Sequence, residues 1–182
     1  MRRNSNYWSI IGAAIGGVLF STAFFYFGQM IRESPDPDRY YHFAISRLLN
    51  GSIKLNTLPG IRGLGWDHYF PDKEFLFHVV TSWAYRLGGE IAVELVPWLL
   101  GSIFWASIVG LAAYHLGGFG ALLGIASFVT APGFVYRQLM LRPHTLAIVL
   151  LLANILAIGK RKPKLAAVFA LLFCLGYHAF YI

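Results

Sequence analysis

The chain has 182 residues, of which 57% are hydrophobic and only 13% are charged, and its mean hydropathy is positive. A soluble domain of this length is less apolar, so the composition predicts an integral membrane protein. The net charge of +7 does not indicate a nucleic-acid partner, because the basic residues form no single patch interleaved with exposed aromatic residues. With Cys174 as the one cysteine, the chain has no disulfide framework and no thiolate metal cluster.

The first expected transmembrane helix covers residues 10–28. Its apolar run of eighteen residues would extend roughly 27 Å, close to the hydrocarbon thickness of a bilayer. A retained signal anchor is favoured over a cleaved signal peptide, because no convincing small-x-small cleavage site follows. Gly12 and Gly16 lie one turn apart and predict a face of small residues for close helix contact.

Residues 29–90 are expected to form a long extracytoplasmic loop. The eight acidic residues of the chain lie in this loop or just beyond it: Glu33, Asp36, Asp38, Asp67, Asp72, Glu74, Glu90 and Glu94. Long uncharged runs flank the loop on both sides. Any chemistry that uses carboxylates is therefore expected there.

Two amphipathic helices are expected within this loop. The first begins at Asp38 as its N-cap, runs to about Leu49 and ends at Asn50-Gly51. The second covers residues 72–87, is capped by Asp72, and ends before a pair of glycines. Its broad apolar face is typical of an interfacial helix that lies on the membrane surface.

Four further spans are expected at residues 94–116, 119–136, 141–159 and 165–182. The run from Leu95 to Tyr136 contains forty-two residues without a charge, which is too long for one span, and Gly117-Gly118 interrupts it. A helical hairpin is the expected result, and Pro132 should kink or end its second helix. Because the chain stops within the last span, we expect either an incomplete chain or a truncated gene product.

The predicted fold class is thus an all-α polytopic membrane protein with about five transmembrane helices and one long loop. Basic residues at positions 2–3 and 160–164 lie beside apolar runs, and an even number of crossings separates them. The positive-inside rule then puts the N-terminus in the cytoplasm and loop 29–90 outside a plasma or inner membrane.

A candidate polar site lies at the start of the first loop helix. Asp38 and His42 are one helical turn apart and point the same way, so they could hold a divalent cation or relay a proton, with Asp36 as a weaker partner. The alternative is that Asp38 only caps the helix and His42 is a surface or packing residue. The histidines show no i, i+4 pairing with one another, so neither zinc nor haem is indicated.

Two further groups of side chains are candidates for substrate contact. Arg137 and Arg142 lie near the expected outer surface, where a planar guanidinium suits the phosphate of a lipid; the alternative is that they anchor the interface. Trp66, Asp67 and His68 combine an aromatic ring with ionisable groups that could contact a sugar or an acceptor. Aromatic residues at this position also commonly lie at lipid headgroups.

The layout resembles the membrane glycosyltransferases of the GT-C class. One N-terminal span is followed by a long external loop that opens with Asp38-Arg39-Tyr40-Tyr41-His42, and this motif is similar to the first acidic motif of oligosaccharyltransferase catalytic subunits. Asp72–His78, continuing to Tyr85–Gly88, is similar to the second loop helix of those enzymes and of protein mannosyltransferases. Arg142-Pro143-His144 resembles the Arg-Pro turn that opens a later span.

The resemblance implies a glycosyltransferase, or its N-terminal module, that moves a sugar from a polyprenyl-phosphate-linked donor with inversion at the anomeric carbon. Asp38 would bind Mg²⁺ or Mn²⁺ or activate the acceptor, with His42 and Asp36 as further metal ligands. The implied partners are membrane lipid, the polyprenyl-phosphate sugar donor and other membrane protein subunits, without nucleic acid.

The chain also departs from the GT-C pattern. It has fewer spans than these enzymes, and the later loop at residues 136–143 contains no second acidic motif. The alternative is therefore a non-catalytic membrane subunit, a truncated or degenerate relative that scaffolds a larger complex. A transporter or channel is less favoured, because the expected spans contain few ionisable groups.

Overall fold

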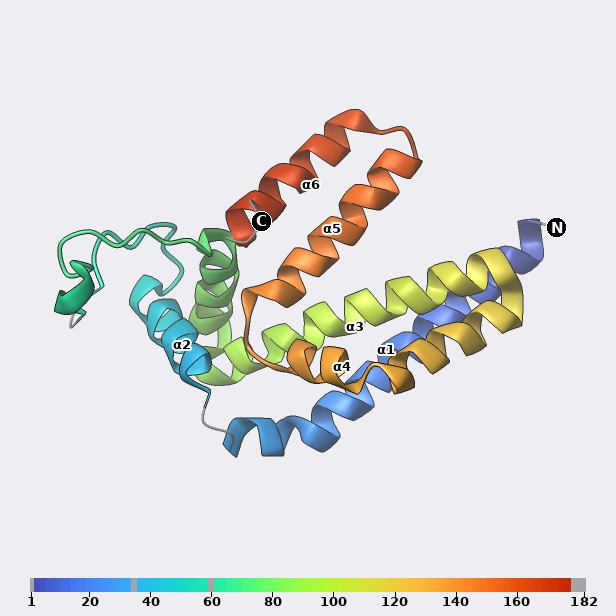
Figure 1. Cartoon of the computed structure of the whole chain (residues 1–182), viewed down its shortest axis with the longest axis horizontal. Coiled ribbons are helices and arrows are strands. Elements are labelled where there is room, and N and C mark those ends of the chain that lie inside the picture. Colours follow the sequence, from blue (N-terminus) through green and yellow to red (C-terminus); the bar gives the residue numbers. More distant parts are fainter. Residues whose placement is uncertain (1, 34–35, 59–60, 178–182) are drawn as a thin grey trace. The chain divides into compact units, whose positions relative to one another are not determined.

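The structure is a computed structural model that describes residues 2–33, 36–58 and 61–177. Over these ranges the chain forms helices and connecting segments without a strand, which confirms the expected all-α class (Figure 1). The elements are α1 (Arg2–Glu33), α2 (Pro37–Leu49), the 3-10 helix η1 (Arg62–Leu64), α3 (Phe75–Thr130), α4 (Pro132–Leu139), α5 (Pro143–Gly159) and α6 (Pro163–Gly176).

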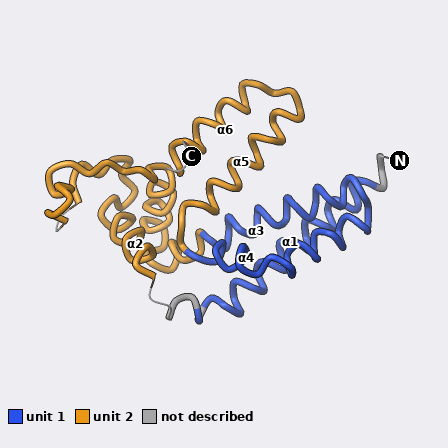
Figure 2. The backbone as a smooth tube through the Cα atoms, viewed as in Figure 1, with its two compact units in different colours: residues 1–35, 97–140 blue, residues 36–96, 141–182 orange. Residues whose placement is uncertain are grey.

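The chain divides into two compact units, each built from segments that are distant in the sequence (Figure 2). Unit 1 comprises residues 1–35 and 97–140, and unit 2 comprises residues 36–96 and 141–182. The long helix α3 contributes its first part to unit 2 and its remainder to unit 1. As a consequence, the expected loop helices and the Arg142 region belong to the same unit.

Helix length and composition support a membrane protein. Within the described ranges, Ser5–Gly28 of α1 and the helix Phe75–Thr130 are long and apolar enough to cross a membrane, and α4 with α5 could make a third, broken span. Many large apolar side chains of α1 are exposed, including Ile10, Val18 and Phe25, as expected where lipid replaces water. Two or three spans are supported by this criterion, and the expected five are not confirmed.

A sharp reversal lies within α3, in unit 1. Gly117 has a φ of 63°, a left-handed conformation that glycine adopts without a steric penalty. The part of α3 after Gly117 folds back on the part before it. A Cβ on Gly124 would lie only 2.9 Å from Cγ2 of Val109, which shows how closely the two parts pack. The reversal is found at the glycine pair where the sequence predicted the turn of a hairpin.

The first helix packs closely against α3 in unit 1. A Cβ on Gly16 would overlap the backbone oxygen of Trp105, and one on Gly12 would lie 2.7 Å from Cβ of Ala113. The two backbones can approach this closely only because the glycines lack side chains. The predicted face of small residues on α1 is therefore confirmed.

Replacing Gly16 by Ala should destabilise unit 1 by about 1–3 kcal/mol, because the added methyl group meets rigid backbone rather than a side chain that can move. The matched control is Gly17→Ala, whose Cβ would meet Cβ of Ala106 at an ordinary 3.9 Å. Thermal unfolding of both variants in detergent checks the prediction. Equal melting temperatures for the two variants would contradict the close approach.

Prolines place several helix boundaries differently from the expectation. The third expected span covered residues 119–136, but α3 ends at Thr130 and Pro132 begins α4 at its first position. Ala131 is held outside the helical region by the proline that follows it, with φ −115° and ψ 53°. In the same way α5 begins at Pro143 rather than at residue 141. Of the expected last span, residues 178–182 lie outside the described residues.

The first loop helix is capped by a different residue from the one predicted. The N-cap of α2 is Asp36, not Asp38, because Pro37 at the first helical position holds Asp36 in extended backbone and lacks an N–H itself. The Asp36 side chain accepts a hydrogen bond from the Asp38 N–H at 3.2 Å. The helix ends as predicted at Asn50, whose φ of 44° is left-handed.

The second loop helix begins at Phe75 and does not end at the glycine pair that was expected to terminate it. The helix continues through a positive φ of 64° at Gly89 and becomes the long α3. Asp72 lies before this helix, where its carboxylate accepts a hydrogen bond from the Glu74 N–H at 3.0 Å. The side chains that follow Asp72 are thereby fixed at the start of α3.

A small apolar core holds the connector between α2 and α3 in place. Its buried residues are Ile45, Leu49, Leu58 and Phe70. The connector doubles back on itself, since the Leu58 N–H donates to the Trp66 carbonyl at 2.6 Å. This turn places the Trp66 ring beside Tyr41 of α2, with ring centroids 6.5 Å apart. In the same unit, α5 and α6 lie side by side as a hairpin (Figure 1).

Candidate functional site

A cavity of about 370 Å³ opens in unit 2. Its lining comes from α2, the connector up to the turn just before α3, Arg142 with the first residues of α5, and the residue after α6. The lining residues are Asp38, Tyr41, His42, Trp66, Lys73, Glu74, Arg142, Pro143, His144 and Tyr177. Carboxylates, cations, imidazoles and aromatic rings therefore face one space.

Four residues selected from the sequence lie around this cavity: Asp38, His42, Trp66 and Arg142. They come from three segments that are far apart in the sequence. Packing in unit 2 thus brings together the proposed carboxylate, imidazole, ring and guanidinium.

Other predicted site residues lie elsewhere. The His68 side chain is 89% exposed, lies 3.7 Å from the Asp67 carboxylate, and lines a different cavity of about 590 Å³. Neither residue is among those lining the first cavity. Arg137 lies on α4, which belongs to unit 1. The roles expected for these three residues stay predictions.

Arg142 connects the two carboxylates at the start of α2. Its Nη2 donates to Oδ1 of Asp36 at 2.9 Å and lies 3.2 Å from Oδ2 of Asp38. Asp36 is only 4% exposed, whereas 58% of the Asp38 side chain is exposed. Asp36 is therefore a structural cap and ion-pair partner, and Asp38 is the carboxylate that can meet a ligand.

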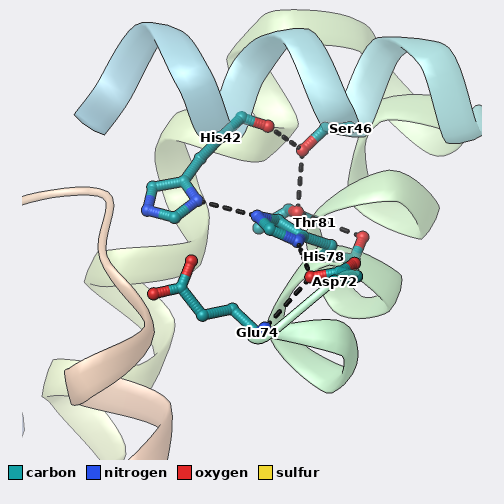
Figure 3. Close-up of polar contacts among 6 residues, drawn as sticks. All are labelled: His42, Ser46, Asp72, Glu74, His78 and Thr81. Atoms are coloured by element: carbon teal, nitrogen blue, oxygen red, sulfur yellow. Dashed lines mark hydrogen bonds and ion pairs between the residues drawn. The ribbon is translucent and has the colours of Figure 1, made fainter. Parts of the chain in front are cut away.

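A chain of three ionisable side chains begins at His42, which lines the cavity (Figure 3). Nδ1 of His42 lies 2.9 Å from Nε2 of His78, and Nδ1 of His78 lies 2.7 Å from Oδ1 of Asp72. Because a carboxylate only accepts, Nδ1 of His78 carries a proton. When His78 is neutral, His42 donates from its own Nδ1, and Nε2 of His42 is left as an acceptor.

Two buried hydroxyl groups fix the helices that carry these imidazoles. The Ser46 hydroxyl lies 2.6 Å from the His42 carbonyl and 2.7 Å from the Thr81 hydroxyl. Thr81 in turn donates to the His78 carbonyl at 3.2 Å. Because Ser46 and Thr81 are fully buried, this contact holds α2 and α3 in one register beside the imidazole pair.

The surroundings hold two cavity groups in their neutral forms. Burial, followed by the charges of His78, Arg142 and His144, lowers the pKa of His42 to about 3. Burial, aided by nearby carboxylates including Glu74, raises the pKa of the Tyr41 phenol. At neutral pH the cavity therefore presents an uncharged imidazole and an uncharged phenol.

Sequence reasoning missed Lys73, Glu74, Asp72 and His78 as site residues. The detectable signal was the spacing of Glu74 and His78, which are four residues apart and share one face at the start of a helix. The i, i+4 spacing was considered only between pairs of histidines, so a glutamate paired with a histidine was missed. No short stretch of sequence indicated that Glu74 and His78 lie close to His42.

Comparison with known proteins adds no relative to this picture. No family model, no curated protein and no solved structure matches the chain. The function must therefore be argued from the cavity and from the short motifs that resemble the GT-C class.

Proposed function

We propose that this chain is a GT-C-like glycosyltransferase, or the N-terminal module of one. It transfers a sugar from a polyprenyl-phosphate-linked donor to an acceptor on the extracytoplasmic side. The observation that carries the proposal is the single cavity lined by Asp38, Trp66 and Arg142, because phosphoglycosyl transfer needs a carboxylate, a sugar contact and a cation together.

The proposed topology retains five crossings, a cytoplasmic N-terminus and an extracytoplasmic loop at residues 29–90, in a plasma or inner membrane. It counts the two legs of α3 on either side of Gly117 as separate spans and adds α5 and α6. Support comes from the reversal at Gly117 and from the basic turn at residues 160–164 between α5 and α6. A lipid-linked donor then meets the cavity at the outer surface.

The donor phosphate is assigned to the cations of the cavity. Arg142 and Lys73 both line it, and a guanidinium suits phosphate because its planar fork can donate two parallel hydrogen bonds. Trp66 offers a face for the sugar ring. Arg137 remains a proposed second phosphate contact, and Asp67 with His68 remain proposed acceptor contacts.

In the proposed reaction, Asp38 removes the proton of the acceptor nucleophile as it attacks the anomeric carbon. The bond between that carbon and the donor phosphate oxygen breaks on the opposite face, which inverts the configuration and releases polyprenyl phosphate. Asp38 suits this task better than Asp36, because Asp36 is buried and already accepts two hydrogen bonds.

The resemblance implies an Mg²⁺ or Mn²⁺ ion at Asp38, Asp36 and His42. In this conformation these residues fit such an ion poorly, because the Arg142 guanidinium already bridges the two carboxylates. His42 Nδ1 faces another imidazole, and nitrogen is not the ligand that Mg²⁺ prefers. The proton and phosphate steps are therefore assigned to side chains of the chain itself.

Binding of farnesyl phosphate tests the proposal, with farnesol as the uncharged comparison. Measured on the detergent-solubilised chain in EDTA, farnesyl phosphate should bind at least about tenfold more tightly than farnesol, because a charge-assisted hydrogen bond contributes about 1.5–3 kcal/mol. Lys73→Gln should remove much of this difference, and Lys160→Gln, in the turn after α5, should leave it unchanged.

A non-catalytic scaffold subunit is the second candidate. The observation that favours it is the bridge from Arg142 to Asp36 and Asp38, which ties α2 to the start of α5 as a structural contact would. Equal binding of farnesyl phosphate and farnesol, together with purification in a fixed ratio with other membrane proteins, would support the scaffold and exclude the transferase proposal.

A further inference from the structure

The geometry points to a transition-metal site, suited to Zn²⁺, formed by His42, Glu74 and His78. These side chains offer one ligand atom each, and the three atoms lie within 4.8 Å of one another. His42 comes from α2, Glu74 from the turn directly before α3, and His78 from the first turn of α3 (Figure 3). The proposal does not depend on glycosyl transfer.

The separation of the imidazoles is close to that of a metal-bound pair. Nδ1 of His42 and Nε2 of His78 are 2.9 Å apart. Two nitrogens bound tetrahedrally to zinc, at about 2.0–2.1 Å each, lie about 3.3–3.4 Å apart. A zinc ion could thus replace the shared proton if the rings separate by a few tenths of an ångström. The displaced proton leaves Nδ1 of His42, or returns to the same ring at Nε2.

Burial favours a fixed ligand arrangement. His42 is 2% exposed and His78 is 0% exposed, so the packing around both rings limits their rotation. The contact between Ser46 and Thr81 holds the backbone carbonyls of both histidines. Ligands that are already ordered lose little conformational entropy when a metal binds.

Asp72 acts as the outer partner of the proposed site. Its carboxylate accepts the Nδ1 proton of His78 and so directs the Nε2 lone pair toward His42. The same oxygen accepts from the Glu74 N–H at 3.0 Å, which fixes the backbone of the third ligand. A carboxylate behind a ligating histidine both orients the ring and strengthens it as a ligand.

The ligand types select the class of metal. Two imidazoles and one carboxylate suit Zn²⁺ and similar transition metals, whereas Mg²⁺ prefers oxygen ligands alone. His42 and Glu74 also line the cavity, so the fourth position of a tetrahedral ion would face the cavity. Three protein ligands with an open fourth position are the pattern of a catalytic rather than a structural zinc site.

Metal analysis of the full chain tests the site. After incubation with Zn²⁺ and dialysis in detergent, the unsubstituted protein should retain one zinc per chain, and Co²⁺ should give the visible absorption of a tetrahedral ion. His78→Gln and Glu74→Gln should each lose the metal, with affinity lowered at least about 100-fold. Asp72→Asn should lower it by about 10–100-fold.

The control is His68→Gln, because the His68 side chain is exposed and is not one of the three clustered ligands. It should retain zinc at the level of the unsubstituted chain. Less than a tenth of a zinc per chain in the unsubstituted protein would overturn the proposal, whatever the stability of the variants. Equal zinc loss in His68→Gln and His78→Gln would overturn it as well. Because farnesyl phosphate binding is measured in EDTA, each proposal can fail separately.

Discussion

Asp38→Asn is expected to lower sugar transfer by about 100-fold to 10,000-fold, the usual contribution of a general base. Asparagine keeps the shape of the side chain but cannot take a proton from the acceptor. The side chain is 58% exposed, and an exposed ion pair such as the one with Arg142 contributes little to folding. A loss of transfer would therefore report on the reaction rather than on unfolding.

The measurement is transfer from a panel of polyprenyl-phosphate hexoses in membranes that contain the complete chain. Glu90→Gln removes another exposed carboxylate of unit 2, outside the lining of the cavity, and should leave transfer unchanged. If Asp38→Asn transfers sugar as fast as the unsubstituted protein, the assignment of Asp38 as the base is wrong. No transfer by the unsubstituted protein would instead favour the scaffold.

Arg142→Met is expected to destabilise unit 2 by about 3–5 kcal/mol, because it leaves the buried carboxylate of Asp36 without its guanidinium. Arg142 is expected to stabilise unit 2 mainly by compensating the negative charge of Asp36. The double variant Asp36→Asn with Arg142→Met removes both charges and should unfold at a higher temperature than Arg142→Met alone.

Thermal unfolding in detergent checks this order of stability. Arg62→Met is the control, because Arg62 is an exposed arginine on η1 and its replacement should change the melting temperature little. If the double variant is as unstable as Arg142→Met, the loss does not come from the uncompensated Asp36 charge. The lower stability of Arg142→Met would then be explained by lost packing of the arginine stem rather than by the ion pair.

Backbone signals in the sequence predicted several parts of the fold. The glycine pair at 117–118 indicated the reversal within the apolar run, and Pro132 indicated the end of its second helix. Asn50 indicated the end of the first loop helix. These features depend on a few neighbouring residues, because glycine, asparagine and proline restrict or permit particular backbone angles wherever they occur.

The first helix cap was a local feature that was nevertheless assigned to the wrong residue. Asp38 was predicted as the cap because Pro35 and Pro37 were expected to keep the chain extended up to it, but Pro37 is the first helical residue and Asp36 is the cap. The same change explains the two different roles of the aspartates. The Asp36 carboxylate accepts hydrogen bonds from the Asp38 backbone N–H and from Arg142, whereas Asp38 lines the cavity.

The sequence by itself determined an apolar, all-helical chain, its main turns, and the glycines that let α1 approach α3. These follow from hydrophobic runs and from backbone preferences, which are properties of short segments. The tertiary structure decided which side chains meet. His42 reaches His78 across 36 positions, and Arg142 reaches Asp36 across 106 positions. Such contacts depend on how whole helices and loops pack, so no local pattern contains them.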